Sequence, residues 1–356
     1  MNQTYYEGAS MVKMVSRFLA VILAAVMIFS AGACSQQTVP AADVAAFKDP
    51  ETVVYSERFG YFPVNQIAVV FYDDLNSKKA AGILKQIGGK VVGGLGIINL
   101  YQIETNFTTE AELNAAMEAA RVLDGVELVF PNAEIVMDIT VEGTPCSPLN
   151  DPVFEDSQNA REYEIIGLEN ASRIIKGSGV NKGKVKMCAL DSALYTGADD
   201  AGEFMGNSRV KGPTTDKSNT DRHGQLIAGG LSHGQMVSNV MSGIAGILDD
   251  DVEIEVANLF DGKPEYTEIQ ENEADITQGV YGGTAYVIKS LVYLKQQVDK
   301  GATVINCSFN HSNLVPENEE ISKAYTKFFK YMQNKKPGVF FVCSAGNEAL
   351  SLPPIT

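Results

Sequence analysis

Three short segments of the sequence carry side chains suited to proton transfer and hydrogen bonding. Asp191 follows the apolar run VKMCAL, His233 precedes a glycine at the start of a helical stretch, and Asn347 follows the run VCSAG. A carboxylate and an imidazole are common groups of general acid–base catalysis, and an amide donates hydrogen bonds. Because the chain has only three histidines, one beside glycine at the start of a helix is a candidate for function.

A sheet is needed to bring these side chains together. Short apolar runs alternate with helical stretches such as residues 285–300, and this alternation predicts an α/β fold with a doubly wound parallel sheet. Ligands bind such sheets at the carboxyl ends of the strands, and both Asp191 and Asn347 follow an apolar run. The runs expected to form strands are residues 185–190, 252–259, 303–307 and 339–343.

A separate small α+β domain of the ferredoxin-like kind is predicted upstream, over residues 61–140. Its expected order is β-α-β-β-α-β, with one helix capped by Asn76 or Ser77 and the other opened by a capping box at Thr109. We expect Gly93 and Gly94 to form the turn between the second and third strands. The four expected strands are residues 66–72, 90–93, 97–105 and 126–130.

Residues 1–33 have the layout of an export signal. Lys13 and Arg17 precede an apolar stretch at residues 18–29, which is shorter than the roughly 20 residues of a membrane-spanning helix. Small residues then lead to Cys34, so the segment resembles a bacterial lipoprotein signal in which Cys34 receives the lipid. Residues 34–60 would be the tether of an exported protein, either a cell-surface lipoprotein with the membrane as partner or an extracellular protein.

The composition argues against nucleic acid as a partner. The chain of 356 residues carries 28 Lys and Arg against 44 Asp and Glu, a net charge of −16. Phosphate backbones are bound by clustered cations, which such a balance does not favour. The sequence also has no glycine-rich loop that follows a strand into a helix, so nucleotide binding has no support.

Four segments, taken in order, resemble those of the subtilisin-type serine proteases, the subtilase family (peptidase family S8). They are VKMCALDSAL, SHGQMVSNVMSG, VINCSF and VCSAGNE. The upstream small domain resembles the family's inhibitory propeptide, and Asn150-Asp151-Pro152 resembles the start of many mature domains. Residues 150–356 would then be the amino-terminal part of a subtilase catalytic domain.

The resemblance implies a role for each candidate residue. Asp191 would orient His233, His233 would act as general base and acid, and Asn347 would donate to the oxyanion. The family's catalytic serine has no counterpart up to Thr356. We therefore expect a fragment, inactive as given, of a longer serine endopeptidase that cuts peptides or proteins. The edge that would bind the substrate peptide as an added strand comprises Ser308, Phe309 and Asn310.

Two alternatives stay open. His223 also precedes a glycine and resembles the family's histidine, but later glycines would break its helix early, so His233 is preferred. Replacements directly after the His-Gly pair leave a non-catalytic peptide-binding relative, a pseudoprotease, as the alternative function. In the zymogen interpretation the propeptide is an intramolecular inhibitor that is cut between Ile135 and Asn150.

No cofactor is assigned. The run Asp249-Asp250-Asp251 could help to bind calcium, which some subtilases use, but it is more typical of a solvated turn. Cys188, Cys307 and Cys343 lie in apolar runs and are interpreted as buried thiols, while a bridge between Cys307 and Cys343 is left open.

Overall fold

The structure, a computed structural model, describes most of the chain from residue 45 to residue 344. The ranges are 45–137, 167–178, 184–195, 209–215, 232–248, 252–266, 284–311 and 319–344. Cys34, Cys146 and the expected linker at residues 144–151 lie outside them. Within these ranges, no helix has the length and apolar character needed to cross a membrane.

Contacts divide the chain into two compact units. The first comprises Met1–Ala133 and Asn313–Tyr331, and the second comprises Glu134–Ser312 and Met332–Thr356. Each unit therefore takes a segment from a distant part of the sequence.

The first unit contains the predicted small α+β domain. Its elements are β1 (Ala45–Ala46), β4 (Gln66–Phe71), α2 (Ser77–Ile87), β5 (Lys90–Leu95), β6 (Leu100–Glu104), α3 (Glu110–Arg121) and β7 (Val126–Pro131). They form an antiparallel sheet of order β1-β5-β6-β4-β7. The expected β-α-β-β-α-β order is confirmed.

Both helices of this domain begin at caps that the sequence indicates. The Asn76 side chain accepts the backbone N–H of Lys79 at 2.9 Å. Thr109 and Glu112 form a complete capping box: the Glu112 N–H donates to Thr109 Oγ1 at 3.3 Å, and the Thr109 N–H donates to Glu112 Oε2 at 3.1 Å. Helix α2 ends at Gly88, whose φ of 83° favours glycine.

The turn between β5 and β6 differs from the prediction. Gly93 and Gly94 lie inside β5, and the chain reverses through a short 3-10 helix, η1 (Gly96–Ile98), and Asn99, whose φ is 52°. A Cβ on Gly94 would lie 2.5 Å from the Leu100 carbonyl oxygen, and one on Gly93 would overlap the Gln102 side chain and the backbone at Ala46. Glycine is needed there because strands approach closely, so the turn prediction was wrong.

The chain before residue 61, expected to be a tether, already forms strands. β1 pairs with β5, while β2 (Thr52–Ser56) and β3 (Gly60–Phe62) form an antiparallel hairpin. Val53 and Phe62 are fully buried. Burial of apolar side chains offsets the entropy lost by ordering this segment, so residues 45–60 are part of the fold and not a tether.

Buried amides link the strands of the first unit. Gln66 Oε1 accepts from Gln102 Nε2 at 2.9 Å and from Asn132 Nδ2 at 2.8 Å. Gln102 also bonds twice to the backbone of Lys48, accepting its N–H at 2.8 Å and donating to its carbonyl at 2.7 Å. The three amide side chains are at most 1% exposed, so these bonds replace the water that burial removes.

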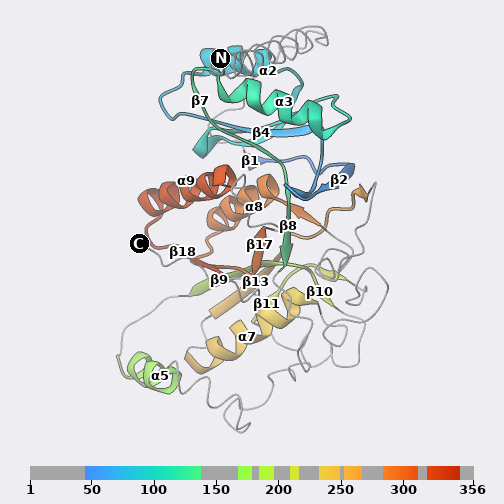
Figure 1. The fold of residues 1–356 in the computed structure, drawn as a ribbon. Helices are drawn as coiled ribbons and strands as arrows, with labels where there is room; N and C mark the ends of the chain where they lie inside the picture. Colours follow the sequence, from blue (N-terminus) through green and yellow to red (C-terminus); the bar gives the residue numbers. More distant parts are fainter. Residues whose placement is uncertain are drawn as a thin grey trace, which may run out of the picture. The chain divides into compact units, whose positions relative to one another are not determined.

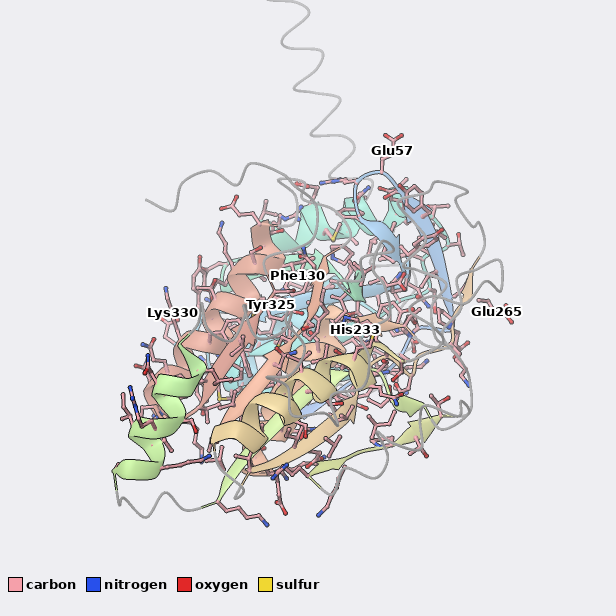
Figure 2. All side chains as sticks on the ribbon, turned by 90° about the horizontal axis from the view of Figure 1, so that it is seen from below. Glu57, Phe130, His233, Glu265, Tyr325 and Lys330 are labelled. Carbon is pink, nitrogen blue, oxygen red and sulfur yellow. The ribbon has the colours of Figure 1, made fainter. Side chains whose placement is uncertain are left out.

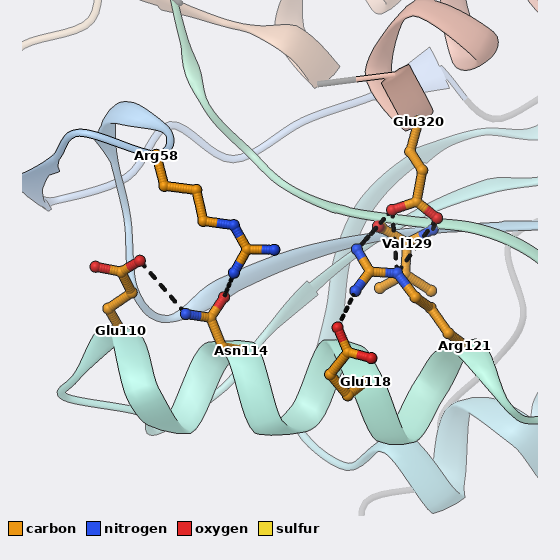
Figure 3. Close-up of polar contacts among 7 residues, drawn as sticks. All are labelled: Arg58, Glu110, Asn114, Glu118, Arg121, Val129 and Glu320. Atoms are coloured by element: carbon orange, nitrogen blue, oxygen red, sulfur yellow. Dashed lines mark hydrogen bonds and ion pairs between the residues drawn. The ribbon is translucent and has the colours of Figure 1, made fainter. Parts of the chain in front are cut away.

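The first residues of helix α9 (Glu319–Lys335) also belong to the first unit. Arg121, at the end of α3, donates to Glu320 at 2.6 Å, to Glu118 at 2.6 Å and to the Val129 carbonyl at 3.0 Å (Figure 3). Further along α9, Lys327 is ion-paired with Glu127 and Asp73. Charged contacts therefore attach this helix to the small domain.

The second unit contains the predicted parallel sheet. Its strands are β9 (Val185–Asp191), β11 (Val210–Lys211), β13 (Val252–Asn258), β16 (Val304–Cys307) and β18 (Phe340–Cys343). All neighbours in the order β11-β13-β9-β16-β18 run parallel. Helices α7 (His233–Leu248) and α8 (Val287–Asp299) lie on opposite faces of this sheet (Figure 1), so the doubly wound α/β fold is confirmed.

Smaller elements complete the second unit. A three-stranded sheet of order β15-β8-β17 joins distant segments, and both of its pairs are antiparallel. The strands β10 and β12 form a short parallel pair. The bounds are β8 (Glu134–Met137), α5 (Leu168–Gly177), β10 (Leu194–Tyr195), β12 (Thr214–Thr215), β14 (Glu265–Tyr266), β15 (Ala285–Tyr286) and β17 (Phe309–His311).

Alternation along β9 decides which side chains face α7. Ala189 and its partner Val256 on β13 form a core cluster against which Val237 and Met241 of α7 pack. Asp191 follows Ala189 by two residues and therefore points to the same face of the sheet. The end of β9 thus presents Asp191 toward the start of α7.

Candidate active site

Asp191 ends β9 and is fully buried. Its two carboxylate oxygens lie 2.8 and 2.9 Å from His233 Nδ1, and the Ser192 N–H donates to it at 2.7 Å. The Ser192 hydroxyl adds a longer hydrogen bond of 3.4 Å. A buried carboxylate needs such donors because it has lost its water shell.

His233 is the first residue of α7, where Figure 2 labels it, and its side chain is almost fully buried. Ser232 caps this helix by accepting the Gln235 N–H with its hydroxyl at 3.1 Å. Since an ionised carboxylate only accepts hydrogen bonds, Nδ1 of the neutral ring carries the proton. The other ring nitrogen, Nε2, is then the atom that can take a proton from a hydroxyl.

A second contact, between Ser192 and Gly234, joins the end of β9 to the start of α7. The Gly234 N–H donates to Ser192 Oγ at 2.9 Å. A Cβ at position 234 would overlap the backbone carbonyl oxygen of Ser192, so only glycine allows this approach. Sequence reasoning assigned Ser192 no role. Its place directly after a strand-ending Asp was the available signal.

The proposed substrate edge lies at the same end of the sheet as Asp191. Asn306 of β16 is the register partner of Ala189 of β9. Ser308 lies two residues after Asn306 and Asp191 two residues after Ala189, so both follow the paired residues at the carboxyl end of the parallel strands. The Asn306 side chain donates to Ser308 Oγ at 2.9 Å. Phe309 begins β17, and its ring packs edge to face with Phe260, the two centroids 6.3 Å apart.

Strand β17 is already paired with another segment of the chain. Phe309 and Asn310 are register partners of Met137 and Val136 in β8, and the other side of β8 pairs with β15. A peptide in this position is held by backbone pairing on both sides. Sequence reasoning missed β8 as a strand, because four residues give too short a pattern and both of its partners are distant.

Several candidates fall outside the described residues. They are Asn347, the alternative histidine His223, and the run Asp249-Asp250-Asp251. Within the part that the structure describes, no group of three or more His, Cys, Asp or Glu side chains is placed to hold a metal ion. Of the predicted site, the structure therefore describes the Asp191 carboxylate, the His233 imidazole and the substrate edge at residues 308–310.

The comparison with known families decides the assignment. Residues 175–354, just over half of the chain, match the sequence profile of the subtilase family. The chain belongs to the subtilase family. The matched residues of this subtilase include Asp191, His233, the edge at residues 308–310, and Asn347, whereas the small α+β domain precedes them.

Other comparisons add less. No curated protein matches this subtilase. It is similar to the crystal structure of fervidolysin from Fervidobacterium pennivorans, described as a keratinolytic enzyme related to subtilisin, at 18% identity and a TM-score of 0.45. That match covers 86% of this chain but 44% of fervidolysin, so this subtilase spans less than half of that protein's length. The assignment rests on the family profile.

Proposed function

We propose that this subtilase is a serine endopeptidase that hydrolyses peptides or proteins with an Asp-His-Ser triad. The observation that carries the proposal is the buried pair of Asp191 and His233, 2.8 Å apart, at the carboxyl end of a parallel sheet. Open α/β sheets bind their ligands at that end, and ionisable groups held there are candidates for chemistry.

The proposed reaction assigns one task to each group. His233 Nε2 takes the proton of the serine hydroxyl as the serine oxygen attacks the carbonyl carbon, and Asn347 donates to the resulting oxyanion. His233 then gives that proton to the nitrogen of the departing amine as the C–N bond breaks. Asp191 holds the ring and stabilises its positive charge. A water molecule then attacks the acyl-enzyme carbonyl while His233 takes the water's proton, and His233 returns that proton to the serine oxygen as the acyl group leaves.

We propose that the serine is encoded after Thr356, which sequencing the gene past this residue tests directly. In the resulting full-length protein, His233→Ala should abolish self-cleavage and hydrolysis of an extended peptide, whereas His223→Ala should retain both. If instead His223→Ala abolished both activities and His233→Ala retained them, His223 would be the general base. If another residue stands in place of the serine, and the protein binds peptides but does not cleave them, it would be a pseudoprotease.

We also propose that the small α+β domain is an inhibitory propeptide. The support is the pairing of β8 with β15 and β17, because a strand in that place leaves no free edge for a substrate. Glu134 and Ile135 of β8 are each only 2% exposed. The proposed cut follows this strand, between Met137 and Asn150.

Helix α9 supplies a second argument for the zymogen. Residues 319–331 lie within the subtilase match, yet by their contacts they belong to the unit of the small domain. Two ion pairs join this helix to the small domain: Arg121 with Glu320, and Lys327 with Glu127. The double variant Arg121→Ala/Lys327→Ala should shorten the lag before activity appears after refolding, and Lys85→Ala on α2 serves as the surface control. An unchanged lag would remove this argument.

The sequence signal supports the proposal that the protein is exported and lipid-anchored at Cys34. Detergent phase separation of cell extracts tests it. The wild-type protein should enter the detergent phase, and Cys34→Ala should move it to the aqueous phase or block its maturation. Equal behaviour of the two proteins would favour a secreted enzyme without a lipid.

A further inference from the structure

Two cysteines lie side by side at the end of the parallel sheet. Cys307 ends β16 and Cys343 ends β18, and the two are direct register partners. The Ser344 N–H donates to the Cys307 carbonyl at 3.3 Å, which holds the two strand ends together. Paired residues of neighbouring strands point to the same face, and strands lie about 4.8 Å apart, within the Cα separation of roughly 4.4–6.8 Å found in disulfides. Both thiols are free in this structure.

The two thiols are not equivalent. Cys307 is buried and Cys343 is exposed. The hydrogen bond between them raises the pKa of Cys307 and lowers the pKa of Cys343 to about 7. Burial and the nearby Cys188 and Asp191 of β9 raise the pKa of Cys307 further, while partial burial works against the lowering at Cys343. An exposed thiolate beside a buried, protonated thiol is the arrangement of an attacking and a resolving cysteine.

Cys188 provides an internal contrast. It is fully buried on β9, where its register partner is Ile305, two residues before Cys307. Burial, together with the charge of Glu255, raises the pKa of Cys188 to about 12. Its thiol stays protonated at neutral pH and lacks access to solvent, so it is inert toward oxidants.

We propose that Cys307 and Cys343 are an oxidation site that forms a disulfide between β16 and β18 when the protein meets a small-molecule disulfide such as oxidised glutathione. The Cys343 thiolate attacks one sulfur, the S–S bond of the oxidant breaks, and a mixed disulfide forms on Cys343 with release of one glutathione thiolate. That thiolate takes the proton of Cys307. The Cys307 sulfur then attacks Cys343, and the second glutathione leaves and is protonated by water. The two protein thiols lose two electrons, and the oxidant gains them.

The bond would fix two segments that the proposed function uses. Cys307 directly precedes Ser308 of the substrate edge, and Cys343 lies four residues before Asn347. Tying β16 to β18 therefore fixes the spacing of the two strands that precede Ser308 and Asn347 in the sequence. This consequence rests on the proposed function, whereas the bond itself does not.

Peptide mapping after oxidation tests the proposal on the full chain. The protein is treated with oxidised glutathione at pH 8, alkylated, digested with trypsin without reductant and analysed by mass spectrometry. Lys323 and Lys330 separate the two cysteines, so a bond between them joins two tryptic peptides. We expect that linked pair in the wild type and in the control Cys188→Ser, and its absence in Cys343→Ser. A stable mixed disulfide on Cys343 in the wild type, or pairing of Cys343 with Cys34 or Cys146, would overturn the proposal.

Alkylation kinetics give a second test that needs no oxidant. The rate of iodoacetamide addition to Cys343 should rise with pH through a midpoint near 7, because the thiolate is the reacting form. Cys307→Ala removes the hydrogen-bond donor and should shift that midpoint upward, toward the roughly 8.5 of a free thiol. A wild-type midpoint at the free-thiol value, unchanged in Cys307→Ala, would contradict the asymmetric pair.

Discussion

Each compact unit of this chain contains a buried polar cluster, and the two clusters differ in chemistry. In the first unit Gln66 bonds to both Gln102 and Asn132, and Gln102 bonds to the Lys48 backbone. In the second unit Asp191 and His233 bond to each other at the end of β9. Burial is nearly complete in both places, so burial alone does not distinguish a structural cluster from the proposed active site.

The groups in the clusters explain the difference. Amides are neutral, and each both donates and accepts, so a network of them fixes strand positions without exchanging protons. An imidazole can take up and release a proton near neutral pH, and a carboxylate beside it stabilises the charged ring, at the cost of burying charge. The pair also lies at a strand end beside a helix start, whereas the amides lie on the sheet of the small domain.

Asp191→Asn should have the largest effect. The amide has nearly the same shape, but it can donate to Nδ1 and so favour the wrong tautomer of His233. We expect kcat/KM of the full-length enzyme to fall by on the order of 10⁴-fold. Urea unfolding provides the control and should show a similar midpoint. Full activity of Asp191→Asn would break the contrast between the two clusters.

Gly234→Ala tests the contact that positions the pair. The added methyl group would overlap the Ser192 carbonyl oxygen, so His233 must move away from its position beside Asp191. We expect activity to fall by roughly 10²-fold, since small displacements of reacting groups have effects of that size. The matched control is Gly177→Ala in α5, where a Cβ has no neighbour within 4 Å. Equal activity of the two variants would show that the close approach is dispensable.

Gln102→Met tests the opposite half of the comparison. The apolar side chain leaves the Lys48 N–H without its hydrogen-bond acceptor and removes one of the two donors to Gln66 Oε1, so the free energy of unfolding should fall by about 1–3 kcal/mol. Once the small domain has been removed by processing, kcat should be unchanged. A loss of activity in the processed enzyme would mean that the amide cluster is more than structural.

Glu112→Gln should give the smallest effect and has a clear pH dependence. Hydrogen bonds from Thr108 and Thr109 lower the pKa of Glu112 below its usual 4.5. A carboxylate whose pKa is lower in the folded state stabilises the fold above the unfolded pKa, and that stabilisation is lost as pH falls through the folded value. The wild type should therefore unfold at slightly more urea than the variant at pH 7, and the two should converge toward pH 3. A difference that persisted at low pH would exclude this cause.

Local signals in the sequence predicted local structure well. The caps at Asn76 and Thr109 involve residues three positions apart, so the sequence alone specifies them. The prediction for Gly93 and Gly94 was wrong because the sequence does not distinguish a glycine in a turn from a glycine that lets a neighbouring strand approach closely. Only the strand pairing separates the two cases. The same limit hid β8, whose two partners are more than a hundred residues away in the chain.

The candidate site shows a similar division. The order of the segments predicted Asp191 as the carboxylate of the site and left two histidines as its candidate partner. The contact of Asp191 with His233 joins residues 42 positions apart and depends on the strand face that α7 covers. The bond between Gly234 and Ser192 is equally non-local, so no pattern within either segment could predict it.

The central place of β8 in its three-stranded sheet affects what a proteolytic nick would do. Cutting the chain after Met137 removes one covalent bond but leaves the backbone pairing of β8 with β15 and β17 in place. The two pieces would migrate separately on a denaturing gel and elute together from a native column. Cleavage and release would then be separate events, and the second would have its own rate.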